Sequence, residues 1–226
     1  MLAVTAMEMT DVSALCIPRS HNVLGDVFAH GHTHYWLHGG RGSTKSSFIS
    51  LCIVLLVVNF PFANAVVVRR FSNTLRDSVY QQILWAIGEL GLDSYFRARL
   101  SPMEITYVPT GQKIIFRGAD DPLKLKGVKF PTGYAAVVWL EELDQFDGIE
   151  AVRSILNSLR RGGDDFWCFY SYNPSRTMWS WVNQEHMERM HRADTLVRKT
   201  SYLDVMTSHP EWLAGRSSRK PSTFTR

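Results

Sequence analysis

The residues between positions 39 and 47 form the stretch of this sequence most suited to chemistry. They are Gly39, Gly40, Arg41, Gly42, Ser43, Thr44, Lys45, Ser46 and Ser47. This order nearly matches the pattern G-x-x-x-x-G-K-[ST], in which backbone N–H groups at a helix start surround phosphate oxygens. Thr44 stands where the pattern has its second glycine. We interpret the stretch as a nucleotide-binding loop, with Lys45 on the β- and γ-phosphates and the Ser46 hydroxyl on Mg²⁺. The alternative is a plain glycine and serine turn.

Two adjacent carboxylates follow an apolar run later in the chain. Residues 137–140 (VVWL) are typical of a buried parallel strand, and Glu141 and Glu142 come directly after them. The carboxyl end of such a strand lies at the sheet edge where ligands bind. We assign Glu141 to the Mg²⁺ site and Glu142 to the attacking water as general base. Taken alone, the pair is also typical of an acidic helix N-terminus, but the glycine-rich loop favours the metal site.

Two further clusters carry weaker signals. The apolar run 166–171 leads into Tyr172-Asn173-Pro174, which would place the Asn173 amide near a γ-phosphate or form a plain turn. Four histidines crowd one segment before the loop: His30, His32, His34 and His38. On a strand, His32, His34 and His38 would share one face. No cysteine or carboxylate lies close in sequence to complete a transition-metal site, so we favour ordinary polar positions.

Strands alternate with helices along the chain, which indicates an α/β fold. We predict strands over 33–38, 65–70, 135–140, 166–171 and 195–205, and helices over 46–58, 72–91, 149–161 and 177–192. Strands over 104–108 and 112–117, joined by Pro109-Thr110-Gly111, would form an inserted β-hairpin. The result is a mostly parallel sheet with helices on both faces.

Composition narrows the class of protein. The chain has 226 residues, 45% of them apolar and 20% charged, which excludes a disordered protein. Three cysteines, two of them in apolar runs, favour a reducing compartment. The net charge of +4 comes from the last eleven residues, which hold four basic and no acidic residues. The mostly apolar residues 48–68 are long enough to cross a bilayer, but Pro61 and the preceding loop favour a buried helix followed by a strand.

Six segments in this order resemble the ATPase domain of a phage terminase large subunit, in the tailed-phage and prophage (PBSX-type) branch. The segments are HYWLHGGRGSTKSSF, VVVRRFSNTLRDSVYQQ, IIFRGADDPLKLKG, VVWLEEL, SYNPSRT and TSYLDV. The resemblance implies a P-loop NTPase of the additional-strand type, with strand 166–171 between the loop strand and the Glu141 strand. It also implies ATP hydrolysis, with Mg²⁺, that drives double-stranded DNA into a procapsid in the host bacterial cytoplasm.

The resemblance also implies roles for single residues. Arg41 resembles the family's loop arginine, a sensor of the γ-phosphate. Ser171, Tyr172, Asn173 and Pro174 match the motif that couples the nucleotide to DNA movement. Lys126 stands near the place of an arginine that reaches a neighbouring subunit's nucleotide. The implied partners are the terminase small subunit, the portal protein and further copies of the chain in a ring, with no membrane. The alternatives are another P-loop nucleic-acid translocase or helicase, and a non-catalytic prophage remnant.

The domain organisation expected from the sequence has three parts. Residues 1–28 show no firm period and are interpreted as a loosely structured lead-in, and residues 29–213 as the ATPase domain. Residues 214–226 are basic and lack an apolar period, so we expect a disordered tail typical of a slipped reading frame or a cut gene. The family's nuclease domain is expected to be absent from this chain.

Overall fold

One mixed sheet of eight strands organises the computed structural model, which describes residues 9–208. The strands are β1 (His34–His38), β2 (Ala63–Arg69), β3 (Phe96–Leu100), β4 (Met103–Tyr107), β5 (Lys113–Gly118), β6 (Tyr134–Glu141), β7 (Trp167–Tyr172) and β8 (Thr195–Lys199). Their order across the sheet is β3-β4-β5-β2-β6-β7-β1-β8. Pairing is parallel from β5 to β8 and antiparallel between β3, β4 and β5. The predicted α/β class with a mostly parallel sheet is confirmed.

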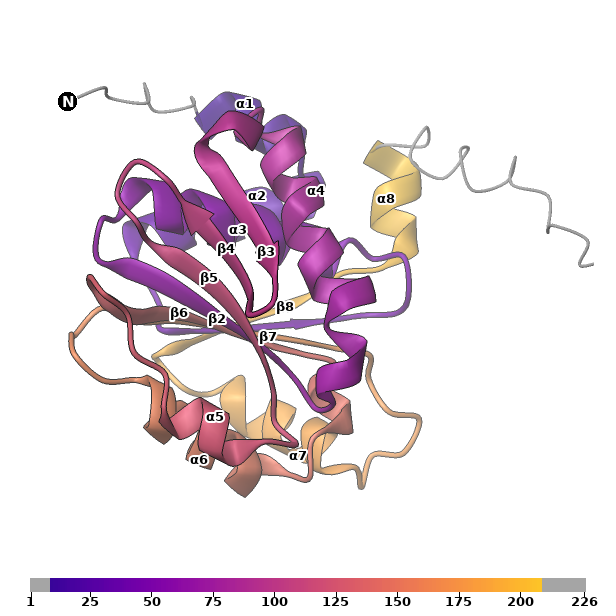
Figure 1. Ribbon diagram of the computed structural model, residues 1–226. Coiled ribbons are helices and arrows are strands. Elements are labelled where there is room, and N and C mark those ends of the chain that lie inside the picture. Colours follow the sequence, from indigo (N-terminus) through magenta and orange to yellow (C-terminus); the bar gives the residue numbers. More distant parts are fainter. Residues whose placement is uncertain (1–8, 209–226) are drawn as a thin grey trace, which may run out of the picture.

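Helices cover both faces of this sheet (Figure 1). They are α1 (Met9–Ala14), α2 (Pro18–Ala29), α3 (Lys45–Asn59), α4 (Gln81–Glu89), α5 (Pro122–Lys126), α6 (Ile149–Leu159), α7 (Trp181–Arg189) and α8 (Tyr202–Ser208). One core packs α2, α3 and α4 against the sheet, and a second core packs α5, α6 and α7 against the opposite face. The predicted two-faced cover is therefore present.

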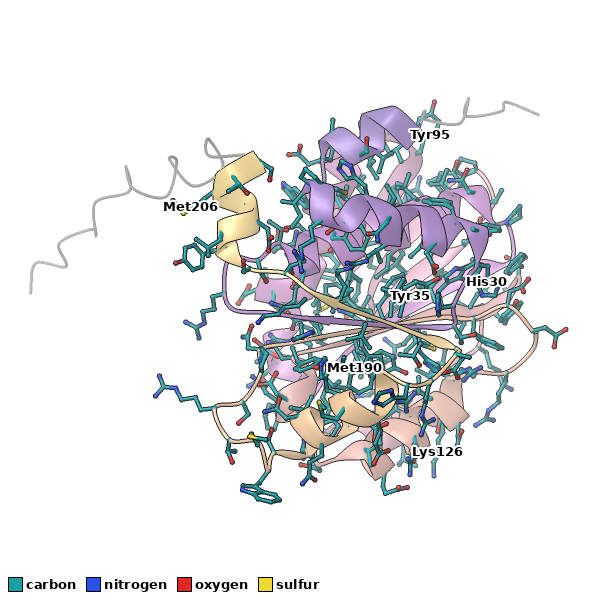
Figure 2. All side chains as sticks on the ribbon, turned by 180° about the vertical axis from the view of Figure 1, so that it is seen from behind. His30, Tyr35, Tyr95, Lys126, Met190 and Met206 are labelled. Atoms are coloured by element: carbon teal, nitrogen blue, oxygen red, sulfur yellow. The ribbon has the colours of Figure 1, made fainter. Side chains whose placement is uncertain are left out.

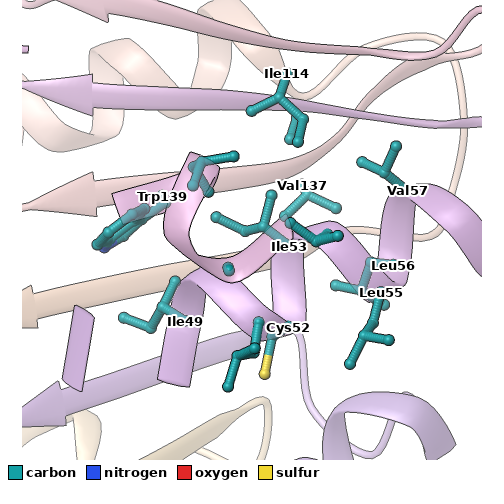
Figure 3. Packing of buried hydrophobic residues seen from close by; sticks show 14 of the residues in the cluster. Ile49, Cys52, Ile53, Leu55, Leu56, Val57, Ile114, Val137 and Trp139 are labelled. Atoms are coloured by element: carbon teal, nitrogen blue, oxygen red, sulfur yellow. The ribbon is translucent and has the colours of Figure 1, made fainter. Parts of the chain in front are cut away.

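Helix α3 is apolar on every side because both of its flanks are covered. All its side chains from Phe48 to Val57 are buried. Figure 3 shows Ile49 and Ile53 of this helix next to Val137 and Trp139 of β6. A helix that is hydrophobic all round belongs in a core or in a membrane. None of the helices within residues 9–208 has the length and apolar content to cross a membrane, so the buried-helix interpretation of residues 48–68 is confirmed.

Strand β7 lies between β1 and β6, as the family resemblance implies. In the register of these parallel strands, His38 of β1 pairs with Tyr172, and Glu141 of β6 pairs with Ser171. Parallel strands carry their carboxyl ends to one edge. The residues after β1, β6 and β7 therefore meet at one edge of the sheet.

The start of the chain departs from the predicted loose lead-in. Within residues 9–28 the structure has two helices, α1 and α2. Val23, Leu24 and Val27 of α2 are buried, and the Trp167 indole N–H donates to the Val27 carbonyl at 2.8 Å. These three apolar residues were too few to predict a helix from the sequence. The residues that cover them lie far away in the chain. Residues 1–8 lie outside the described range.

The predicted helix over 72–91 consists of three consecutive helical segments of different types. A 3₁₀ turn covers Ser72–Thr74, a π-helix covers Arg76–Tyr80, and α4 follows. The predicted apolar stripe is buried throughout: Leu75, Val79, Ile83, Ile87 and Leu90. The period therefore identified the buried side correctly but could not reveal the wider π turn.

Two strand predictions differ from the structure. The inserted hairpin has a further strand, β3, antiparallel to β4; its residues are mostly exposed, so the sequence showed little apolar signal. The strand predicted over 195–205 ends at Lys199, and α8 begins at Tyr202. The Asp204 carboxylate accepts hydrogen bonds from the Ser201 N–H at 2.7 Å and hydroxyl at 2.9 Å. This S-x-x-D capping pattern starts a helix and was the missed signal. The end of the 29–213 domain and the 214–226 tail lie outside the described residues.

Candidate functional site

The glycine-rich loop connects the end of β1 to the start of α3. Gly39 has φ 154°, and a Cβ there would lie 1.8 Å from the Thr200 carbonyl oxygen, so only glycine fits against the segment after β8. Gly42 has φ 77° and Thr44 has φ 60°, both in the left-handed region. Thr44 thus adopts the conformation for which the phosphate-loop pattern uses glycine. Thr44 therefore replaces the glycine of the pattern without changing the backbone path of the loop.

Lys45 closes the loop from the first turn of α3. Its Nζ donates to the Gly39 carbonyl at 2.6 Å, the Gly40 carbonyl at 3.1 Å and the Ser43 hydroxyl at 2.9 Å. It also donates to Asn173 Oδ1 at 3.3 Å, across the sheet edge. Burial lowers the pKa of Lys45 to about 8, opposed by the negative charges of Glu141 and Asp144. The ammonium therefore sits in a pocket of oxygen atoms, which the oxygens of a phosphate could replace.

The acidic pair at the end of β6 lies opposite this loop. The Ser46 hydroxyl donates to Glu141 Oε1 at 3.5 Å, so the two predicted Mg²⁺ ligands meet. Burial raises the pKa of Glu141, and the Arg69 charge opposes that shift most strongly. Glu141 Oε2 is buried and makes no aligned hydrogen bond, although Arg69 Nε lies 2.8 Å away as an ion pair. A buried carboxylate oxygen beside a serine hydroxyl is the hard oxygen set that suits Mg²⁺.

The motif after β7 completes one wall of the same site. Ser171 Oγ accepts a hydrogen bond from the Trp139 indole at 2.9 Å, which links β7 to β6. The Tyr172 hydroxyl lies 2.8 Å from His186 Nδ1 of α7. Asn173 contacts Lys45, as described above, and Pro174 is exposed. The amide that the sequence placed near a γ-phosphate therefore lies within reach of the loop lysine.

A cleft of about 230 Å³ unites these parts. Its walls are Gly40, Arg41, Gly42, Ser43, Thr44, Lys45, Ser46, Ser47, Glu141, Glu142, Ser171, Tyr172 and Asn173. Arg41 is exposed and lies on the wall of the cleft. Gly39 lies at the base of the loop and is buried.

Lys126 is the predicted site residue that the structure places elsewhere. It ends α5, is exposed, and is absent from the walls of the cleft. Figure 2 shows it on the side of the molecule that carries α5 and α6. A role at this chain's own cleft is therefore excluded by position, and a role toward another copy stays a prediction.

The four histidines before the loop have separate partners. His32 pairs with Asp26 at 2.9 Å, and His34 Nδ1 lies 2.9 Å from the Tyr170 hydroxyl. His30 lies near Asp165, and His38 stacks on Tyr172. Within residues 9–208, no group of three or more histidine, cysteine or acidic residues could hold a metal ion. The four positions serve packing and hydrogen bonding.

Arg69 is a site residue to which the sequence assigns no role. It ends β2, the strand next to β6, and its guanidinium pairs with Glu141 at 2.8 Å and with Glu142. Glu142 itself has φ 55°. A charged residue directly after the apolar run 65–68 was the available signal, because two neighbouring parallel strands end at the same edge.

These features define a class before any comparison is made. A glycine-rich loop between β1 and α3, an acidic pair at the end of β6 and an extra strand between those two strands form a P-loop NTPase fold of the additional-strand type.

Comparison with known proteins identifies the family. The family model described as phage terminase large subunit matches residues 31–223. The chain is 37% identical, over 201 residues, to the terminase large subunit of Bacillus phage SPP1, and the match covers 87% of this chain and 47% of that protein. It is 33% identical, over 134 residues, to the PBSX phage terminase large subunit of Bacillus subtilis strain 168, covering 59% of this chain and 29% of the relative. The chain belongs to the phage terminase large subunit family.

Solved structures share the fold. The large terminase of a thermophilic bacteriophage matches with a TM-score of 0.66 at 13% identity, over 92% of this chain and 48% of that one. The N-terminal domain of the DNA packaging ATPase of bacteriophage phi29 matches with a TM-score of 0.58 at 11% identity, over 80% and 96%. At these identities the likeness supports the fold alone. This chain spans about half the length of the first relative that it matches in sequence.

Proposed function

We propose that this chain hydrolyses ATP, as the motor part of a terminase that moves double-stranded DNA into a procapsid. The observation that carries the proposal is the convergence in one cleft of a phosphate-type loop, Lys45, an acidic pair and the Asn173 amide. Large-terminase structures of a thermophilic bacteriophage with ADP and with ATP-gamma-S share this fold and support nucleotide as the ligand.

The residues divide the work of phosphoryl transfer. Backbone N–H groups of 40–45 at the start of α3 would bind the phosphates, and Lys45 would exchange its loop carbonyls for β- and γ-phosphate oxygens. Ser46 and Glu141 would hold Mg²⁺, which supplies charge neutralisation on the phosphates. Glu142 would accept the proton of the attacking water.

Two residues would report the state of the γ-phosphate. Arg41 lies at the mouth of the cleft, where its charge would contact the terminal phosphate. Asn173 shares Lys45 with the loop, so a change in Lys45 on binding or hydrolysis would move the 171–174 segment. We infer that this segment couples nucleotide state to DNA movement.

The assembly and setting are part of the same proposal. We infer partners from the family: double-stranded DNA, the terminase small subunit, the portal protein of the procapsid and further copies of this chain in a ring. Host bacterial cytoplasm is the setting in which such packaging takes place. A packaging reaction with portal and procapsid distinguishes this role from another translocase or helicase.

Steady-state ATP hydrolysis by the full chain, with and without duplex DNA, tests the proposal. Lys45→Ala should abolish hydrolysis, because the phosphate charge loses its fixed partner. Glu142→Gln should leave Mg·ATP binding largely intact and slow turnover by roughly 10²-fold or more. Lys124→Ala, at an exposed lysine of α5, is the matched control and should leave the rate unchanged. A parent without turnover would favour the non-catalytic remnant. Hydrolysis by Lys45→Ala within about threefold of an active parent would instead overturn the assignment of the phosphate loop.

A further inference from the structure

The Arg69 side chain contacts four groups from two parts of the chain, residues 141–142 and residues 74–78. Its side chain is only 9% exposed, its Nε lies 2.8 Å from Glu141 Oε2, and Nη2 pairs with Glu142 Oε2. On its other side, Nη1 donates to the Thr74 carbonyl at 3.2 Å and to the Ser78 hydroxyl at 2.9 Å. The planar guanidinium is therefore held at both ends, and its orientation is determined by the segment after β2.

Glu142 is held through one of its two carboxylate oxygens. Oε2 accepts from Arg69 and also from Gln145 Nε2 at 2.8 Å. Among the residues that the structure describes, no group pairs with Oε1. The backbone of Glu142 is in the left-handed region, with φ 55°, a conformation that is uncommon for a residue other than glycine.

We propose that Arg69 is a positioning residue for Glu142: it anchors one carboxylate oxygen so that the other stays free to take the proton of the attacking water. This inference rests on the proposed ATP hydrolysis and adds a residue to it. A general base acts only within hydrogen-bond reach of the proton that it removes, so its orientation matters as much as its presence. Arg69 acts through Glu142 and contacts no phosphate position itself.

The anchor of Arg69 ties the acidic pair to an unusual backbone segment. Ser78 lies in the π-helix Arg76–Tyr80, and its hydroxyl also donates to the Thr74 carbonyl at 2.5 Å. Single π turns inside helices often occur at functional sites. Thr74 and Ser78 lie four residues apart and supply the two acceptors for one guanidinium edge.

Three variants of the full chain measure the effect on turnover. Arg69→Gln should lower kcat by about 10²-fold, the scale of a misplaced catalytic group, with the KM for ATP within about twofold. Arg69→Lys keeps the positive charge but loses the planar guanidinium, so its kcat should lie between those of Arg69→Gln and the parent. Ser78→Ala removes an anchor without touching either carboxylate and should give a smaller loss of kcat. In a Glu142→Gln background, Arg69→Gln should add little, because the group that it positions is gone.

Arg70→Gln is the matched control. Arg70 is the next residue, and it pairs with Asp147 at 2.7 Å and contacts neither Glu141 nor Glu142. Its kcat and KM should equal those of the parent. Equal kcat for Arg69→Gln and Arg70→Gln would overturn the proposal, as would a full additional loss in the Glu142→Gln background.

Amide hydrogen exchange of the nucleotide-free protein supplies a readout besides activity. Arg69→Gln should raise exchange in residues 74–80 and 142–146, which the guanidinium ties together, while Arg70→Gln should not. A parent without turnover means that the proposed function fails, and the exchange result then decides alone whether Arg69 holds Glu142. Unchanged exchange in Arg69→Gln would overturn the positioning role even in an active enzyme.

Discussion

At the scale of single residues, the site depends on backbone conformations as much as on side chains. Gly39 and Gly42 provide the freedom that the loop needs, yet Thr44 and Glu142 occupy the left-handed region without being glycine. Such positions cost free energy and persist where the surroundings hold them. Both lie on the walls of the cleft, where a phosphate or a water is expected to bind.

Thr44→Gly should make the protein more stable. Thr44 has φ 60°, which a β-branched residue adopts at a cost and glycine adopts freely. We expect the free energy of unfolding to rise by about 1 kcal/mol, because relief of strain exceeds the entropy cost of glycine in the unfolded chain. Denaturant unfolding checks this. Thr44→Ala keeps the Cβ and should gain little; a less stable Thr44→Gly would show that Thr44 is unstrained.

Acid should destabilise the protein through His34. The side chain is buried, its Nδ1 lies 2.9 Å from the Tyr170 hydroxyl, and burial together with the Arg189 charge lowers its pKa to about 4. The unfolded chain binds the proton near pH 6.5 and the folded chain only near pH 4. The contribution is therefore complete above pH 6.5 and falls by about 1.4 kcal/mol per pH unit between 6.5 and 4.

Unfolding free energies of the parent and of His34→Gln, measured between pH 7.5 and 4, test this expectation. His34→Gln should be less stable at pH 7, because it loses the contact with Tyr170, but its stability should depend less steeply on pH. Parallel curves for the two proteins would mean that His34 is not the group responsible.

At the scale of elements, the first helices belong to the core rather than to a loose lead-in. Helix α2 buries Val23, Leu24 and Val27 against α3 and the sheet, and the Trp167 indole donates to its backbone. Helix α3 is covered on its outer side by these residues, which is why its own outer side chains are apolar.

Val27→Ala should lower the free energy of unfolding by about 2 kcal/mol, because it removes buried methyl groups and leaves a cavity. Val108→Ala is the control, since Val108 is 51% exposed and its loss should cost little. Urea unfolding followed by circular dichroism compares the two. Equal stability of both variants would mean that α2 is loosely structured, as the sequence suggested.

At the scale of the whole molecule, the cleft of a single chain does not include Lys126, the lysine predicted to act on a neighbouring chain. The cleft contains Lys45 and Arg41, whereas Lys126 is exposed at the end of α5 and takes no part in it. If the chains assemble into the proposed ring, Lys126 would be available to a neighbour. A lysine lacks the planar fork of an arginine, so its contribution should be the smaller.

Lys126→Ala should lower the ATPase rate only in an assembled ring, by less than the ~10³-fold that arginine fingers supply. Mixing Lys126→Ala chains with an excess of Lys45→Ala chains tests action across a boundary. Each Lys45→Ala chain has a damaged loop but an intact Lys126, so the mixture should regain rate. No recovery in the mixture would argue against action in trans.

The sequence by itself determined the alternation of strands and helices, the glycine-rich loop, the acidic pair and the motif after β7. These signals are local: an apolar run ends in polar residues within a few positions, and parallel strands then bring such ends to one edge. The structure confirms this edge, with Ser46 3.5 Å from Glu141 and Lys45 3.3 Å from Asn173.

Only the tertiary structure decided what lies beside those residues. Arg69 reaches the acidic pair because β2 lies next to β6 in the sheet. The order of the strands cannot be predicted from the sequence of either strand alone. The π turn at 76–80 keeps the buried period of a helix while changing its hydrogen bonds, so periodicity could not reveal it. Lys126 ends α5 away from its own cleft, and its predicted role toward a neighbouring copy stays a prediction. Contacts between segments far apart in the chain form only when the strands pair and the helices pack on the sheet, so they cannot be read from a local stretch of sequence.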